Sequence, residues 1–249
     1  MLQTAIVLIT HQSPPEVAAM AETWQRLNPG ARVHIAYGGT RERFAELGWL
    51  DRTFIDDPRL RTRDHQRDRQ SYLGLMREVA VDLQPLRLDR VLMAECDVMP
   101  LRAGLVDYLE KRRREEGADL LGPRIRRVDG TGHPHYLAHQ SHPAFGRWLA
   151  QSARAEKGTV LMMVGCLTWW TWKAFSAVSE TVEPMPVYLE LAIPTAAHQL
   201  GFRVRELTEL NGFLQPLGEM QPHLAAWQAA GHWVAHPCKK IWRQNNSPT

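Results

Sequence analysis

Short apolar runs alternate with amphipathic stretches in the first half of the chain. The run at residues 5–9 is continuously apolar, which is typical of a strand covered on both faces. A helix start follows this run. It has an N-cap at Ser13, a proline in the first turn at Pro14 and an acid at the third helical position, Glu16. The same patterns predict strands at 32–37, 53–55, 90–93 and 119–121, and helices at 14–27, 41–47, up to residue 83, and at 104–116.

The second half of the chain is less regular. Residues 124–143 are rich in Arg, His and Gly with little periodicity, which predicts a flexible loop. Pro194 interrupts a helical spacing and predicts a helix that begins near Ile193, after a turn that exposes Glu190. The remaining pattern predicts strands at 160–164, 203–207 and 233–237, a turn at 165–167 and a helix at 171–182.

Strands that alternate with helices through short links predict an α/β fold with a mainly parallel sheet. Ligands of such sheets bind beyond the carboxyl ends of the strands. Groups at three of these ends are therefore candidates for binding: residues 10–12, 37–39 and 95–97. Residues 244–249 have the composition of a disordered tail.

Composition narrows the class of protein. A chain of 249 residues with 44% hydrophobic and 23% charged residues is an ordinary globular protein. Its net charge of +3 is too small to indicate a nucleic-acid partner. Of the 30 basic residues 25 are Arg, which suits a phosphate-bearing substrate, although codon bias gives the same composition.

The cysteines and the N-terminus bear on location. Three cysteines without a CxxC pair disfavour a zinc site or a disulfide framework and fit a reducing cytosol. The apolar run at 5–9 is too short for a signal peptide or a transmembrane segment. We therefore expect a cytoplasmic protein, with a peripheral membrane contact left open.

Two carboxylates follow the apolar strand at 90–93. Glu95 and Asp97 are spaced i, i+2, so an extended backbone presents both side chains on one side. Two acids at the end of a buried strand repel each other unless a cation lies between them. Mg²⁺ or Mn²⁺ that also bridges to a diphosphate would relieve the repulsion. The alternative to a metal site is that both acids are simply solvated at the end of the strand.

The order of the elements, from residue 5 to residue 242, resembles the GT-A fold glycosyltransferases that use nucleotide-diphosphate sugars. The landmarks are Glu95-Cys96-Asp97 in the position of the DxD motif, the glycine turn at 164–167, Glu190 in the position of the xED acid, and His236 near the C-terminus. The resemblance implies one GT-A-like, Rossmann-like domain over 1–243. Its nucleotide-binding half would be 1–122 and its acceptor-side half 123–243.

The resemblance also implies roles for individual residues. Asp97 and His236 would hold Mn²⁺ or Mg²⁺, while Glu95 would contact the ribose or a metal-bound water. Gly165 would lie beside the donor and acceptor sugars. In an inverting enzyme Glu190 would take the proton of the acceptor hydroxyl. Further candidates for contacts with the nucleotide are Thr10, His11, Tyr37 (stacked on the base), Asp57, Arg67 and Gln70.

Other interpretations stay open. The motif is ExD, and Leu189 stands where the first acid of the xED motif is expected, so a noncatalytic nucleotide-sugar-binding or protein-interaction module is an alternative. A sugar-phosphate nucleotidyltransferase is disfavoured because residues 10–15 lack a glycine-rich basic loop. Transition-metal ligation and an acceptor-side loop both suit the histidines of residues 133–142, and we favour the loop.

Overall fold

The computed structural model describes residues 2–57, 60, 71–150, 158–181, 187–213, 221–239 and 242. Two predicted nucleotide contacts, Arg67 and Gln70, and the tail at 244–249 lie outside these residues. Within the described ranges, none of the helices combines the length and apolar character that crossing a bilayer requires.

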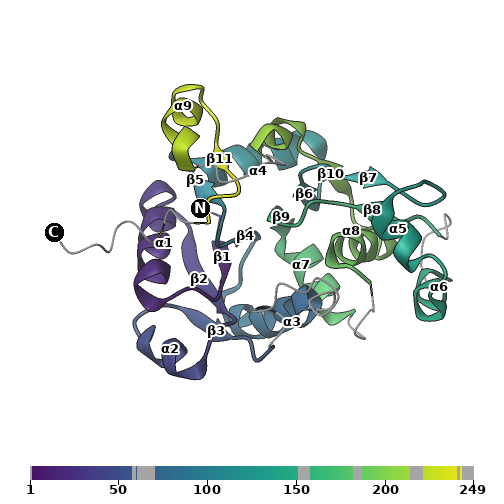
Figure 1. Cartoon of the computed structure of the whole chain (residues 1–249), viewed down its shortest axis with the longest axis horizontal. Coiled ribbons are helices and arrows are strands. Elements are labelled where there is room, and N and C mark those ends of the chain that lie inside the picture. Colours follow the sequence, from purple (N-terminus) through teal and green to yellow (C-terminus); the bar gives the residue numbers. More distant parts are fainter. Residues whose placement is uncertain are drawn as a thin grey trace.

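A seven-stranded sheet with the order β10-β6-β9-β4-β1-β2-β3 forms the centre of the protein (Figure 1). All its neighbouring strands pair in parallel except β9, which runs antiparallel to both β4 and β6. The strands are β1 (Thr4–Thr10), β2 (Arg32–Tyr37), β3 (Arg52–Phe54), β4 (Arg90–Glu95), β6 (Leu120–Gly122), β9 (Leu167–Thr171) and β10 (Val204–Glu206). The predicted α/β class with a mainly parallel sheet is confirmed.

Helices cover both faces of this sheet. Ile6 and Leu8 pack on one face with the apolar sides of α1 (Pro14–Leu27) and α4 (Leu105–Glu116). Ala5 and Val7 pack on the other face with α3 (Ser71–Leu83), α7 (Trp172–Glu180) and α8 (Leu189–Gln199). Alternate residues of β1 therefore enter two separate cores, which explains why its sequence is apolar throughout.

Smaller elements surround the sheet. The helical ones are α2 (Arg41–Glu46), α5 (Pro134–His139), α6 (Pro143–Ala150), α9 (Leu224–Ala229) and the 3-10 turns η2 (Gln84–Leu86), η3 (Thr208–Phe213) and η4 (Gln221–His223). Two antiparallel ribbons pair β5 (Met99–Pro100) with β11 (Val234–Ala235) and β7 (Arg126–Arg127) with β8 (Leu161–Met162).

The second half differs from the predictions in two places. Residues 167–171 form β9, a central strand that was not predicted between the turn at 165–167 and the helix at 171–182. Its pairing with β4 and β6 is a tertiary contact that local pattern does not reveal. Residues 124–143 were expected to be a loop but contain β7 and α5 and reach the start of α6 at Pro143.

The start of α8 was also predicted wrongly. The helix begins at Leu189 and contains Pro194 in its interior, so Glu190 lies in its first turn and not in an exposed turn. Proline lacks the N–H that would bond the carbonyl four residues earlier, which here belongs to Glu190. That carbonyl instead accepts a hydrogen bond from the N–H of Met163 at 2.9 Å. A tertiary partner therefore compensates for the proline.

The C-terminal strap, which we define as residues 233–239 and 242, fastens the turn after β4. β11 pairs with β5 directly beyond this turn (Figure 1). The N–H of Cys238 donates to the carbonyl of Asp97 at 2.7 Å, and the indole N–H of Trp242 donates to the carbonyl of Cys96 at 2.7 Å. The segment at 95–97 is thus held by residues from the far end of the chain.

Removing the indole donor should loosen the strap. In Trp242→Phe the ring is largely kept, but the carbonyl of Cys96 loses its partner, which costs about 1–3 kcal/mol of unfolding free energy. We expect faster hydrogen exchange at the amide of Cys238. Trp24→Phe is the matched control, because the buried indole N–H of Trp24 makes no hydrogen bond within the described part of the chain. Unchanged exchange at Cys238 in Trp242→Phe would contradict this account.

Candidate metal and catalytic site

The carboxyl ends of β1, β2 and β4 meet at one edge of the sheet. The parallel register pairs Thr10 with Tyr37 and Ile9 with Glu95, so these strands end side by side. Parallel sheets bind ligands at such an edge. The site is built on the turn that follows β4.

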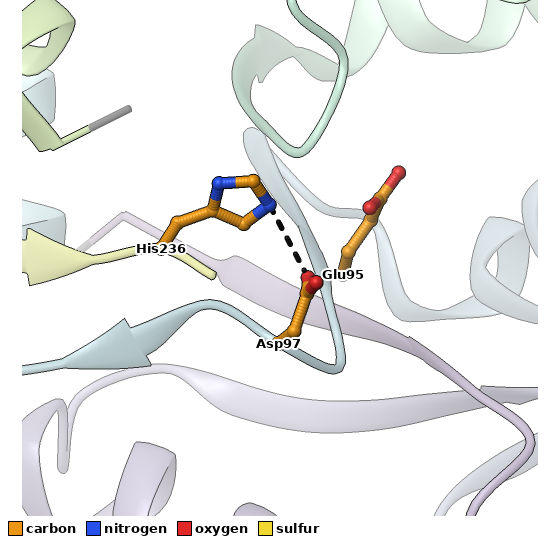
Figure 2. Close-up of side chains that lie close together, drawn as sticks. All are labelled: Glu95, Asp97 and His236. Atoms are coloured by element: carbon orange, nitrogen blue, oxygen red, sulfur yellow. Dashed lines mark ion pairs between the residues drawn. The ribbon is translucent and has the colours of Figure 1, made fainter. Parts of the chain in front are cut away.

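Glu95, Asp97 and His236 converge at this edge. The antiparallel pair Ala235–Met99 aligns β11 with β5, so His236 comes opposite the residues that precede Met99. The Nε2 of His236 lies 3.4 Å from the Oδ1 of Asp97. Figure 2 shows the imidazole of His236, from the end of β11, beside the carboxylate of Asp97 in the turn after β4, with Glu95 at the end of β4. One ligand atom from each of the three lies within 4.8 Å of the other two.

The three side chains fit a divalent cation. The Oδ1 of Asp97 is buried and accepts no hydrogen bond among the described residues, although it faces the imidazole. A buried carboxylate oxygen without a donor is costly unless a positive charge is present. Two carboxylates and one imidazole form a donor set that accommodates Mn²⁺ well and Mg²⁺ through its oxygens. Among the described residues, this is the one cluster with metal-ligand geometry.

The thiols near the turn are poor metal ligands. Cys96 lies between the two acids in sequence, and its Sγ accepts from the Nε2 of Gln12 at 3.8 Å. Burial, reinforced by the charge of Asp97, raises the pKa of Cys96 to about 12. Burial also raises the pKa of Cys166 well above its ordinary value. Both remain thiols at neutral pH, so oxygen and imidazole ligands dominate the site.

Glu190 enters the site from the first turn of α8. Its side chain is 18% exposed. Burial raises the pKa of Glu190 to about 7, and the charge of Glu95 adds to this rise. A hydrogen bond from the backbone of Gly165 acts in the opposite direction. The glycine turn and the xED-like acid, which are distant in sequence, are therefore in contact, and the carboxyl is poised to exchange a proton near neutral pH.

Histidines of α5 lie against the start of α8. The Nε2 of His135 is 3.9 Å from the Oε2 of Glu190. The ring of His135 stacks on Tyr188, with 4.3 Å between centroids and 24° between planes. The N–H of Tyr188 donates to the Nε2 of His139 at 3.3 Å. The sequence marked this segment only as histidine-rich, and the proximity of His135 to Glu190 was missed because nothing local indicates it.

The predicted nucleotide contacts are spread along the edge. Thr10 is buried and its hydroxyl accepts from the N–H of Gln12 at 3.1 Å, while His11 is exposed. Asp57 lies half-buried beyond β3 and lines a hollow of about 680 Å³ with Arg41. The structure thus places these residues at the predicted edge but near different strands.

Tyr37 is not available for the predicted stacking. Its side chain is 0% exposed, its ring stacks on Phe44 at 6.2 Å, and its hydroxyl donates to the carbonyl of Gln12 at 3.0 Å. A fully buried ring offers no face to a nucleobase, so this placement argues against the role expected from the sequence. Tyr37 instead holds the backbone that follows β1.

No protein-family model and no curated protein matches this sequence. Solved structures similar to the chain include the galactosyltransferase LgtC in complex with donor and acceptor sugar analogues, at 14% identity and a TM-score of 0.48 over 94% of this chain and 87% of that one. Another is CMP:2-keto-3-deoxy-manno-octonic acid synthetase complexed with CTP, at 14% identity and a TM-score of 0.45 over 92% and 98%.

A third similar structure is a nucleotide-diphospho-sugar transferase, described as putative, from Desulfovibrio desulfuricans G20, at 12% identity and a TM-score of 0.44 over 84% of this chain and 80% of that one. All three TM-scores lie below 0.5.

The buried carboxyl of Glu190 should make stability depend on pH. Its pKa is about 7 when folded against an ordinary 4.5, so the folded state binds the proton more tightly. This contribution is fully present below about pH 4.5 and is lost as pH rises through about 7. Glu190→Gln stays neutral and should therefore gain stability relative to wild type as pH rises, by up to about 3 kcal/mol near pH 8.

Thermal unfolding of both proteins in metal-free buffer between about pH 5 and pH 8 measures this difference. A difference in Tm that is constant across that range would contradict the buried, proton-binding state of Glu190.

Proposed function

We propose that this protein is a metal-dependent glycosyltransferase that moves a sugar from a nucleotide-diphosphate donor to an acceptor hydroxyl. The observation that carries the proposal is the convergence of Glu95, Asp97 and His236 at the carboxyl edge of the sheet, with Glu190 close by. Two distant segments supply a cation site, and a third supplies a carboxyl suited to proton transfer. That combination is what a displacement at a sugar linked to diphosphate requires.

The chain's own residues would divide the work at the donor. Asp97 and His236 would hold Mn²⁺ or Mg²⁺, with Glu95 either a third ligand or a partner of the ribose or of a metal-bound water. A bound divalent cation supplies Lewis-acid stabilisation of charge on a departing diphosphate. The hydrogen bonds from Cys238 and Trp242 to the turn support this geometry by fixing its backbone.

Glu190 would act as the general base. Its carboxylate would take the proton of the acceptor hydroxyl while that oxygen attacks the anomeric carbon. The N–H of Gly165 orients the carboxylate, and burial keeps it basic enough to accept a proton near neutral pH. Gly165 would lie beside the donor and acceptor sugars, and a Cβ added there would come within 3.0 Å of Leu189.

Nucleotide contacts are proposed for Thr10, His11 and Asp57, which lie at the ends of β1 and β3. Arg67 and Gln70 precede α3 in sequence and remain candidates for phosphate or ribose contacts. The alternatives are a noncatalytic module that binds a nucleotide sugar or a protein, and a sugar-phosphate nucleotidyltransferase. Binding of nucleotide sugars without turnover would favour the module, and release of diphosphate from a nucleoside triphosphate would favour the nucleotidyltransferase.

Nucleoside diphosphates should stabilise the protein only when Mn²⁺ is present. Asp97→Asn removes the negative charge of one ligand and His236→Gln removes the imidazole, and we expect metal affinity to fall by ~100-fold or more, since losing outer partners alone costs about 10–100-fold. Thermal shift with UDP and GDP, with and without Mn²⁺, measures the effect. Asp107→Asn is the control, because Asp107 is exposed on α4. Equal Mn²⁺-dependent shifts in Tm for Asp97→Asn and wild type would contradict the assignment of Asp97 as a metal ligand.

Loss of the base should lower turnover without loss of donor binding. Glu190→Gln keeps the size of the side chain but cannot accept the proton, so we expect kcat to fall by about 10²–10⁴-fold. The donor affinity measured by titration should stay close to that of wild type. Release of nucleoside diphosphate from a panel of nucleotide sugars with Mn²⁺ provides the assay. A variant that retains full kcat would exclude Glu190 as the base.

A further inference from the structure

A base that is buried has to return its proton to solvent before the next turnover. Glu190 is 18% exposed, whereas the neighbouring side chain of His135 is 42% exposed. The 3.9 Å between the Nε2 of His135 and the Oε2 of Glu190 is about 1 Å longer than a hydrogen bond. A small ring movement or one bridging water closes this gap, and catalytic hydrogen bonds are often long before substrate binds.

The position of His135 is set by several contacts. Its ring stacks on Tyr188, the N-cap residue of α8, and Glu190 follows two residues later. His139 lies four residues after His135 in the same short helix, so both point to one side of it. The Nε2 of His139 accepts the N–H of Tyr188, which ties this side of α5 to the start of α8. The stacking on Tyr188 thus places His135 beside the base, and the bond to His139 holds α5 against the start of α8.

We propose that His135 is the proton outlet of Glu190: its imidazole receives the proton taken from the acceptor hydroxyl and passes it to solvent. This role rests on the proposed function of Glu190 as base. His135 does not touch the sugar carbon and acts through Glu190, so it is a positioning and relay residue.

The protons and bonds balance at each step. The acceptor O–H bond breaks as its oxygen bonds the anomeric carbon, and the carbon–oxygen bond to the diphosphate breaks. The proton forms an O–H bond on Glu190, then leaves it to form an N–H bond at the Nε2 of neutral His135. The imidazolium finally loses this proton to water or buffer, which restores both side chains.

Other groups shape this proton path. Glu95 is the acid whose charge acts on Glu190, and the backbone of Gly165 bonds its carboxylate. The ring of His133 lies 5.5 Å from that of His135. Burial, with the charge of Arg126 second, lowers the pKa of His133. Both effects disfavour a proton on the ring of His133.

Two substitutions of His135 distinguish a role in proton transfer from a role in packing against Tyr188. His135→Phe keeps a ring on Tyr188 without a protonatable nitrogen, and we expect kcat to fall about tenfold or more with little change in KM for the donor. His135→Ala leaves space for added imidazole, which should restore turnover in proportion to its concentration. His142→Asn is the control, since His142 is exposed in the same segment and its ring accepts the N–H of Ala144.

A second measurement needs no turnover. The C2 proton of His135, followed by NMR, should report a pKa that falls by about one unit in Glu190→Gln, because a nearby carboxylate stabilises the imidazolium. An unchanged pKa overturns the pairing. Wild-type kcat in His135→Phe, or no rescue of His135→Ala by imidazole, overturns the relay alone. A wild-type protein that cleaves no nucleotide sugar overturns the proposed function together with the relay.

Discussion

The pairing of β5 with β11 is the constraint on which the site depends. It places an imidazole from the end of the chain opposite a carboxylate from its middle. The strap then bonds the carbonyls of Cys96 and Asp97, so the backbone of the acidic turn has little freedom to relieve the repulsion between its side chains. A rigid turn that holds two acids together is stable when a cation neutralises them. The fold thus brings negative charge together at a single position, where a cation would stabilise it.

The sequence predicts the framework well where the signals are local. Mainly apolar runs identify β1, β2 and β4, because strands of a parallel sheet are buried on both faces. β9 was not predicted, although the threonines and tryptophans of Leu167–Thr171 are residue types favoured in strands. The pairing of β9 with β4 and β6 is a tertiary contact that the sequence does not reveal. The same limit applies to α5, whose histidines carry no apolar period.

The site could be predicted only in part. The i, i+2 spacing of Glu95 and Asp97 is readable from sequence, whereas His236 came from a family resemblance and is brought near by tertiary pairing. Tyr37 shows the opposite case. An aromatic side chain at a strand end can either face the ligand edge or pack into the core. Tyr37 packs into the core, against Phe44. No one-dimensional pattern distinguishes an aromatic side chain that lines a site from one that supports it.

Pro194 affects how the candidate base, Glu190, is held. Without its N–H, the carbonyl of Glu190 is open to the N–H of Met163, which joins the first turn of α8 to the segment that leads into Gly165. The backbone of Gly165 in turn bonds the carboxylate of Glu190. Glu190 is therefore held at its carbonyl by Met163 and at its side chain by Gly165. The proline that argued against a helix at Glu190 takes away the helical partner of this carbonyl, which is what opens the carbonyl to its tertiary bond with Met163.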